Sequence, residues 1–281
     1  MLFFLSFPFV TLLFFFMIVS YNTKNYRVNE DVKKLFLGDS HLEYGIIDTM
    51  LLNSKNLSKG AESFYYSYHK LKLVLTSSNV KSVYLGFSYH NLSSAYDQWT
   101  YGNGNFDFPS SYFYLLPFSE KLNLILWNRN HLSFFFKNTI LKGFDSFING
   151  PTFLSNFHIY SKDSKAESDR MDRKLTFFYE DRESSFSNLN IKYLNKIIRL
   201  LKSKKIELVF VNTPIHPYYF SKIPKPYFVK FDSIINTNNI KLIDFNKLNI
   251  TNDDYYMPDG EHVNARGANL ITNELMKKYN N

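Results

Sequence analysis

The sequence predicts an α/β domain built on a parallel sheet. Short, largely apolar runs recur along the chain of 281 residues, and segments with helical spacing separate them. Strands that are apolar on both sides are typical of a parallel sheet covered by helices on both faces. The chain is long enough for one such domain with an insertion, and its 45% hydrophobic residues allow a sizeable core.

Five runs are predicted to be strands because each is short, mostly apolar and bounded by turn residues. They are residues 32–37, 56–57, 82–87, 206–211 and 242–245. Helices are predicted between them, where apolar residues recur every three or four positions. These helices are residues 44–52, 64–76, 189–201, 227–235 and 264–279.

The pattern loosens between Leu92 and Ser187. This region holds both tryptophans, the turn 102–105 and the aromatic run 134–136. We interpret it as a mostly helical insertion with long loops, inside a domain that spans residues 32–281. It either forms a satellite hydrophobic core or serves as a substrate groove or membrane-facing cap.

The chain begins with an uncharged apolar segment. Residues 2–19 include seven phenylalanines and no charged residue, and such a segment is just long enough to span a bilayer core. No small-residue cleavage site follows at residues 20–23. We therefore predict an uncleaved transmembrane signal anchor over residues 1–20 and a polar linker over 21–31; a removed signal peptide and a buried core helix are the alternatives.

Charge and cysteine content narrow the function classes. The net charge is +8 and the pI is about 9.2, but the basic residues are spread along the chain without a dense block. Nucleic acid is therefore not an expected partner, and the charge fits anionic polymers or a membrane surface better. The absence of cysteine excludes disulfides, thiolate catalysis and cysteine-based zinc sites.

A Gly38-Asp39-Ser40-His41 motif follows the first predicted strand. A strand that ends in a tight turn and leads into a helix presents a serine hydroxyl at the carboxyl edge of the sheet. There the N-terminus of the helix favours developing negative charge. Ser40 is therefore a candidate nucleophile, although the motif alone is common.

A second motif, Asp259-Gly260-Glu261-His262, precedes the last predicted helix. An acid three residues before a histidine can accept a hydrogen bond from one ring nitrogen. The other nitrogen is then free to take a proton from a nucleophile. The alternative is a surface turn with a solvated histidine.

Together the two motifs resemble the first and last sequence blocks of the SGNH, or GDSL, hydrolase superfamily. The resemblance covers about residues 32–280, apart from 92–187. It implies a flavodoxin-like three-layer α/β/α sandwich in which Ser40 is the nucleophile, His262 the general base and Asp259 the residue that orients it. A serine mechanism of this kind needs no metal and no cofactor.

The second block of that superfamily has an asparagine-rich turn and a glycine whose N–H helps to hold the oxyanion. Residues 56–63 fit this block, which makes Gly60 the candidate, with the backbone N–H of Ser40 as a second donor. An ordinary turn glycine is the alternative for Gly60.

The third block departs from the superfamily pattern, which is Gly-x-Asn-Asp with an asparagine that donates to the oxyanion. Here the third strand leads into Gly86-Phe87-Ser88-Tyr89-His90-Asn91. Ser88 takes the asparagine position, and Asn91 lies three residues further on. Either residue could donate, or the oxyanion hole has only two donors.

Among subgroups, the chain most resembles envelope proteins of alginate O-acetylation and of teichoic acid D-alanylation. The likeness lies in the N-terminal anchor, the histidine after Gly-Asp-Ser, and the stretch 212–217 after the fourth strand. Those relatives work outside the membrane, often with an integral membrane acyltransferase. The resemblance thus implies an extracytoplasmic domain, although basic residues after the anchor favour the cytoplasm.

Two further histidines are candidates for contact with substrate. His41 follows the nucleophile, where it either gates the site or faces solvent. His216 lies in the loop after the fourth strand, where a histidine before proline is often structural.

The expected function is that of a membrane-anchored serine esterase or O-acyltransferase acting on acyl, in particular acetyl, esters of a cell-envelope or secreted glycan. One alternative is a catalytically degenerate carbohydrate-binding or assembly protein on the same fold. Another is a lipase-type esterase acting on the bilayer, which requires an apolar acyl tunnel beside Ser40. The distance between Ser40 and His262 distinguishes the first alternative from an enzyme. Hydrogen-bond reach between them favours catalysis, and a large separation favours a binding protein.

Overall fold

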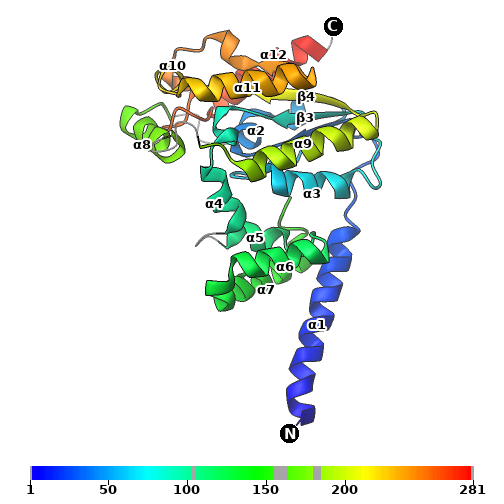
Figure 1. Cartoon of the computed structure of the whole chain (residues 1–281). Coiled ribbons are helices and arrows are strands. Elements are labelled where there is room, and N and C mark those ends of the chain that lie inside the picture. The colour runs from blue at the N-terminus through cyan, green and yellow to red at the C-terminus, as the bar shows by residue number, and fades with distance from the viewer. Residues whose placement is uncertain (1, 103–105, 155–163, 180–184, 280–281) are drawn as a thin grey trace.

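A five-stranded parallel sheet forms the centre of the molecule (Figure 1). The computed structural model describes residues 2–102, 106–154, 164–179 and 185–279, with side chains from residue 12 onward and that of Val10. The strand order is β2-β1-β3-β4-β5, and all neighbours are parallel. The strands are β1 (Lys34–Leu37), β2 (Ser54–Asn56), β3 (Ser82–Gly86), β4 (Glu207–Asn212) and β5 (Lys241–Asp244). The predicted α/β class and its parallel sheet are confirmed.

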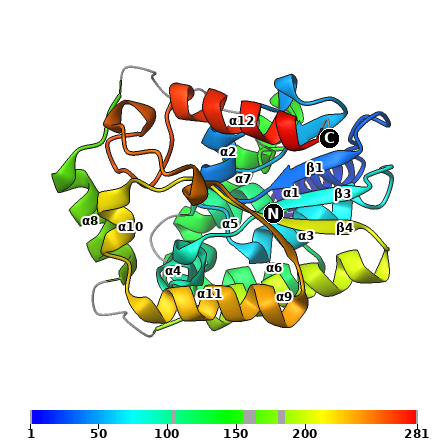
Figure 2. The same cartoon turned by 90° about the horizontal axis from the view of Figure 1, so that it is seen from above.

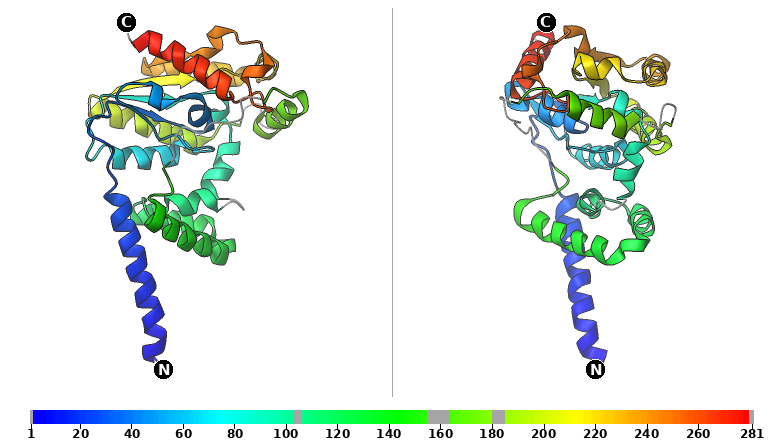
Figure 3. Two further views of the ribbon diagram at one scale, coloured as in Figure 1. Left: turned by 180° about the vertical axis from the view of Figure 1, so that it is seen from behind. Right: turned by 90° about the vertical axis from the view of Figure 1, so that its left-hand side faces the viewer.

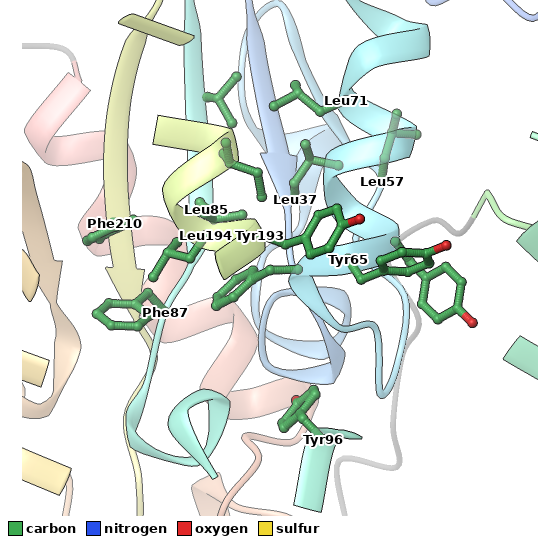
Figure 4. Close-up of a cluster of buried hydrophobic side chains, with 14 of the residues drawn as sticks. Leu37, Leu57, Tyr65, Leu71, Leu85, Phe87, Tyr96, Tyr193, Leu194 and Phe210 are labelled. Carbon is green, nitrogen blue, oxygen red and sulfur yellow. The ribbon is translucent and has the colours of Figure 1, made fainter. Parts of the chain in front are cut away.

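Helices cover both faces of this sheet. Successive side chains of a strand point to opposite faces, so Leu35 and Leu37 join one core while Phe36 joins the other. The first core packs beneath α3 (Phe64–Val74), α9 (Asn188–Ser203) and α11 (Lys225–Asn238), and Figure 4 shows Leu37, Leu85, Phe87 and Leu194 within it. The second core packs beneath α2 (Ser40–Gly45) and α12 (Ala265–Tyr279), on the opposite side in Figure 2.

The first helix after β1 begins earlier than predicted. Residues 44–52 were expected to be helical, but α2 already begins at Ser40, and only a short 3₁₀ turn, Asp48–Met50, lies beyond it. Asp39 caps this helix, because its carboxylate accepts the N–H of His41 at 3.0 Å. In the first turn Leu42 is the one apolar residue, among Ser40, His41 and Glu43, so the turn carries no apolar periodicity.

The insertion is mostly helical within its described residues. It contains α4 (Ala95–Tyr101), α5 (Asp107–Tyr112), α6 (Phe118–Trp127), α7 (Leu132–Asn149) and α8 (Ser168–Tyr179). We call α5, α6 and α7 the cap; they lie beside α1, whereas α8 contacts α10 (Pro217–Ser221) at one end of the sheet (Figures 1 and 2). Gly102 ends α4 in a left-handed conformation, and residues 103–105 of the expected turn lie outside the described residues.

The N-terminal helix α1 (Leu2–Lys24) extends into the predicted linker. Across the described residues, no helix is both long and apolar enough to cross a membrane, so the transmembrane anchor predicted over residues 1–20 is not found. The second half of α1 instead packs on α7 (Figure 3). There the rings of Phe15 and Phe144 lie 4.5 Å apart.

Candidate active site

Ser40 lies at the carboxyl end of β1, as the first residue of α2. The turn before it requires glycine: Gly38 has φ +152°, and a Cβ there would lie 3.2 Å from the backbone of Gly86 on β3. The close approach of these two strands sets the position of the serine.

The structure brings Ser40, His262 and Asp259 together. Ser40 Oγ lies 2.6 Å from His262 Nε2, and His262 Nδ1 lies 2.8 Å from Asp259 Oδ2. The other oxygen of Asp259 accepts the backbone N–H groups of Glu261 and His262, each at 3.2 Å. An ionised Asp259 can only accept, so Nδ1 carries a proton and Nε2 is the acceptor that faces the serine.

Electrostatics favour a charged imidazole at this position. Burial lowers the pKa of His262, but the charge and hydrogen bond of Asp259 outweigh burial and raise the pKa above its ordinary value. Burial likewise raises the pKa of Asp259, and His262 reverses that effect, so its carboxyl is easier to ionise. The pair therefore stabilises the imidazolium that forms when a nucleophile loses its proton.

Gly60 lies beside the serine, but its N–H is already engaged. A Cβ on Gly60 would lie 3.8 Å from Ser40 Cβ. Its N–H donates to Glu43 Oε2 at 2.6 Å, and Glu43 belongs to the same helix as the serine. An oxyanion would have to replace this carboxylate to use the donor.

Ser88 and Asn91 act at Asp39 rather than at the nucleophile. The Asn91 side chain donates to Asp39 Oδ2 at 2.7 Å and accepts the Ser88 N–H at 2.8 Å. Neither residue lines the cavities that reach Ser40. Both residues therefore hold the turn of the nucleophile from behind.

A buried polar cluster lies behind the nucleophile. His90 Nε2 donates to Asp39 Oδ2 at 2.8 Å, and its Nδ1 lies 3.3 Å from Glu261 Oε1. His41 shares a hydrogen bond of 2.7 Å with Thr213, and its Nε2 lies 3.6 Å from Glu261. Among the described residues, the ring nitrogens that face Glu261 and both of its oxygens lack a hydrogen-bond partner.

Glu261 and His41 differ in how their surroundings affect ionisation. Burial raises the pKa of Glu261, but His90 and Lys174 outweigh burial and hold it well below its usual range. Burial and the charge of His90 lower the pKa of His41 to about 4, so His41 is neutral at neutral pH.

The ring geometry of His41 and His90 does not fit a metal ion shared with Glu261. The two rings stack with their centroids 4.1 Å apart and their planes at 25°. Lone pairs lie in the ring planes, so those of stacked rings run side by side and do not converge on one ion. The cluster is better described as two buried histidines and a carboxylate in electrostatic contact behind the nucleophile.

His216 takes no part in the cavities beside Ser40. Its ring nitrogen Nε2 lies 2.7 Å from Asp253 Oδ1, and its Nδ1 accepts the Tyr218 N–H at 3.2 Å. Its backbone N–H donates to Gly260 at 2.8 Å. His216 thus supports the turn that carries Asp259 and His262.

Two small cavities open on the nucleophile. One has a volume of about 160 Å³ and reaches His41, His90 and Glu261. The other, of about 370 Å³, lies between the triad and α8, which contributes Arg170 and Lys174. The described cleft therefore places two basic side chains beside the triad.

Sequence reasoning missed His90, Glu261 and the two basic residues of α8. The sequence offered a signal for the first two, since His90 follows the third strand and Glu261 lies inside the Asp259–His262 motif. No sequence signal could place α8 at the cleft, because the insertion matches no motif.

The chain is similar to known proteins over part of its sequence and in its fold. A family model matches residues 177–281, which is less than half of the chain. No curated protein matches the sequence. Two solved structures are similar. One is a candidate acylhydrolase from Bacteroides fragilis, with 10% identity, 93% of each chain covered and a TM-score of 0.40. The other is a GDSL-like lipase from Bacteroides thetaiotaomicron, with 9% identity, 89% of each chain covered and a TM-score of 0.39. Similarity at this level carries no argument about activity.

Proposed function

We propose that the chain is a serine esterase or O-acyltransferase. The observation that carries this proposal is the contact of 2.6 Å between Ser40 Oγ and His262 Nε2, with Asp259 at 2.8 Å on the other ring nitrogen. This is the geometry that lets a base take the proton of a hydroxyl as it attacks.

The proposed reaction has two steps. Ser40 Oγ bonds to the acyl carbonyl carbon while its proton passes to His262 Nε2, and the negative charge moves onto the carbonyl oxygen. The backbone N–H groups of Ser40 and Gly60 receive that charge, once Glu43 has released the second of them. The alcohol leaves with the proton of His262, and water or a sugar hydroxyl then takes the acyl group from the serine.

The cleft supports a glycan ester with a small acyl group. A volume of about 370 Å³ suits an acyl group and a sugar ring. Arg170 and Lys174, one helical turn apart, favour an acidic sugar or a phosphate-bearing polymer. Such polymers belong to the cell envelope, so we propose an extracytoplasmic location at the membrane, with an integral membrane acyltransferase as a partner.

A Ser40→Ala variant tests the mechanism. It should lose at least about a thousandfold in kcat/KM toward an acetyl ester, because the nucleophile is absent. Labelling by a serine-reactive phosphonate should disappear with it. The matched control is Ser63→Ala, which removes a buried hydroxyl without a hydrogen-bond partner among the described residues. Unchanged turnover in Ser40→Ala would overturn the proposal.

One observation favours a second candidate, a glycan-binding protein without turnover. The carboxylate of Glu43 occupies the N–H of Gly60, and neither Ser88 nor Asn91 supplies a replacement donor at the cavities. A chain that binds an acidic glycan with the same affinity before and after Ser40→Ala, and cleaves no ester, would fit this candidate.

A further inference from the structure

The exposed apolar side chains of this molecule are concentrated on one region. Large hydrophobic side chains are exposed on α1, α6 and α7, and only Leu52, Val229 and Leu248 are exposed elsewhere among the described residues. Phe118 is 76% exposed and Ile148 75%. An apolar surface gathered in this way marks an interaction site.

A groove runs along α1 within this region. Its volume is about 710 Å³, the largest of the cavities described here. The α1 wall is a single helix face, because its residues recur at helical spacing. The lining residues of α1 are Leu12, Leu13, Phe16, Met17, Ser20, Tyr21 and Lys24. The cap contributes Phe113, Phe118, Lys121 and Phe136 as the facing wall.

The groove walls are held together by close packing. A Cβ on Gly143 of α7 would lie 2.3 Å from the hydroxyl of Tyr114 and 2.9 Å from Phe15. Glycine therefore lets α1 and α7 approach, and the rings of Phe16 and Tyr114 lie 5.5 Å apart. Figure 3 shows the cap beside the second half of α1.

The groove is apolar along its length and basic at one end. Lys121 Nζ lies 3.5 Å from Ser20 Oγ, and Lys24 lines the same end. Neither lysine forms an ion pair with a carboxylate of the described residues. Burial and the charge of Lys24 lower the pKa of Lys121 to about 8, so a negative group there would relieve this repulsion.

These features match the two parts of a lipid. From Leu12 to Lys24 a helix rises about 18 Å, a length that suits a fatty acyl chain. We propose that this groove binds one anionic phospholipid, with an acyl chain between Phe16 and Phe136 and the head group at Lys24 and Lys121. The exposed faces of α1, α6 and α7 contact the surrounding lipid surface, and no membrane-crossing helix is required.

Vesicle flotation of the full chain tests this inference. The protein should float with vesicles of phosphatidylcholine and phosphatidylglycerol roughly 10- to 30-fold better than with phosphatidylcholine alone. The Lys24→Ser/Lys121→Ser variant should lose this preference. Its control, Lys202→Ser/Lys204→Ser, removes the same charge from exposed positions at the C-terminal end of α9 and should keep the preference. Equal flotation with both vesicles, or an unchanged lysine variant, would overturn the inference.

The contributions of the groove and of the surrounding apolar surface to lipid binding can be tested with different variants. A Met17→Trp variant fills the groove, so native mass spectrometry should show a several-fold loss of retained phosphatidylglycerol while flotation persists. Phe118→Ser/Leu126→Ser should lower flotation several-fold, and Leu52→Ser/Val229→Ser should not. A chain that dimerises through these faces and does not float would contradict the inference, whatever its esterase activity.

Discussion

Glu62 and Glu261 are both buried carboxylates with a lysine beside them, and their surroundings differ. Glu62 lies between the sheet and the cap, where Ser67 donates to one oxygen at 2.7 Å and Lys70 to the other at 2.5 Å. Glu261 lies at the candidate active site, where two histidine rings and Lys174 approach within 3.3–3.6 Å but none forms a hydrogen bond. Both side chains are 1% exposed, so burial does not distinguish them.

The difference in hydrogen bonding indicates a structural role for Glu62 and a functional role for Glu261. The pair of Glu62 and Lys70 is saturated, since Tyr112 also donates to Glu62 and Lys70 donates to the Leu57 carbonyl at 2.6 Å. A saturated network fixes one arrangement. The groups around Glu261 retain unused acceptors, and unsatisfied buried groups with shifted pKa values are typical of functional sites.

The largest effect is expected on stability, when the pair of Glu62 and Lys70 is broken. Lys70→Met leaves Glu62 buried without its cation, and the free energy of unfolding should fall by about 3–5 kcal/mol. Denaturation with urea measures it. Lys72→Met, an exposed position on the same helix, should change stability by less than about 0.5 kcal/mol. Equal stability of the two variants would show that the two clusters do not differ as argued.

A smaller effect is expected at Gly60, whose N–H can donate either to Glu43 or to an oxyanion. Glu43→Ala frees the N–H of Gly60 for an oxyanion, and kcat/KM toward an acetyl ester should rise roughly 10- to 100-fold, the worth of a hydrogen bond to a charged group. Glu43→Gln keeps an acceptor and should raise it less. A fall in activity for both variants would mean that Glu43 holds the loop or the substrate.

The smallest effect is a shift in pH dependence. The charge of Glu261 helps to raise the pKa of His262, although Asp259 raises it more and burial opposes both. Glu261→Gln removes that charge, so the pKa of His262 falls, the base becomes neutral at lower pH, and the acid limb of the pH profile of kcat/KM moves to lower pH. Glu167→Gln, at an exposed position, is the control. A shift to higher pH would contradict the charge that we assign to Glu261.

The predictable parts of this molecule are those encoded locally. Apolar runs predicted β1, β3, β4 and β5, whereas the polar β2 (Ser54–Asn56) overlaps its predicted run only at Asn56. Two short motifs predicted the residues that meet at Ser40. The position of Lys174 depends on how an insertion folds back, and the contact of Glu43 with Gly60 depends on a loop 17 residues away. The start of α2 was missed because Ser40 and His41 are polar residues that pack against the site instead of presenting apolar spacing.

The separation of Ser40 and His262 by 222 residues also has a consequence in time. At about 5–20 residues per second, synthesis delivers the histidine roughly 10–45 s after the serine. A growing chain therefore carries its serine without a base until His262 has been made. Under the proposed serine mechanism, a nascent chain that has not yet reached His262 has no base to activate Ser40.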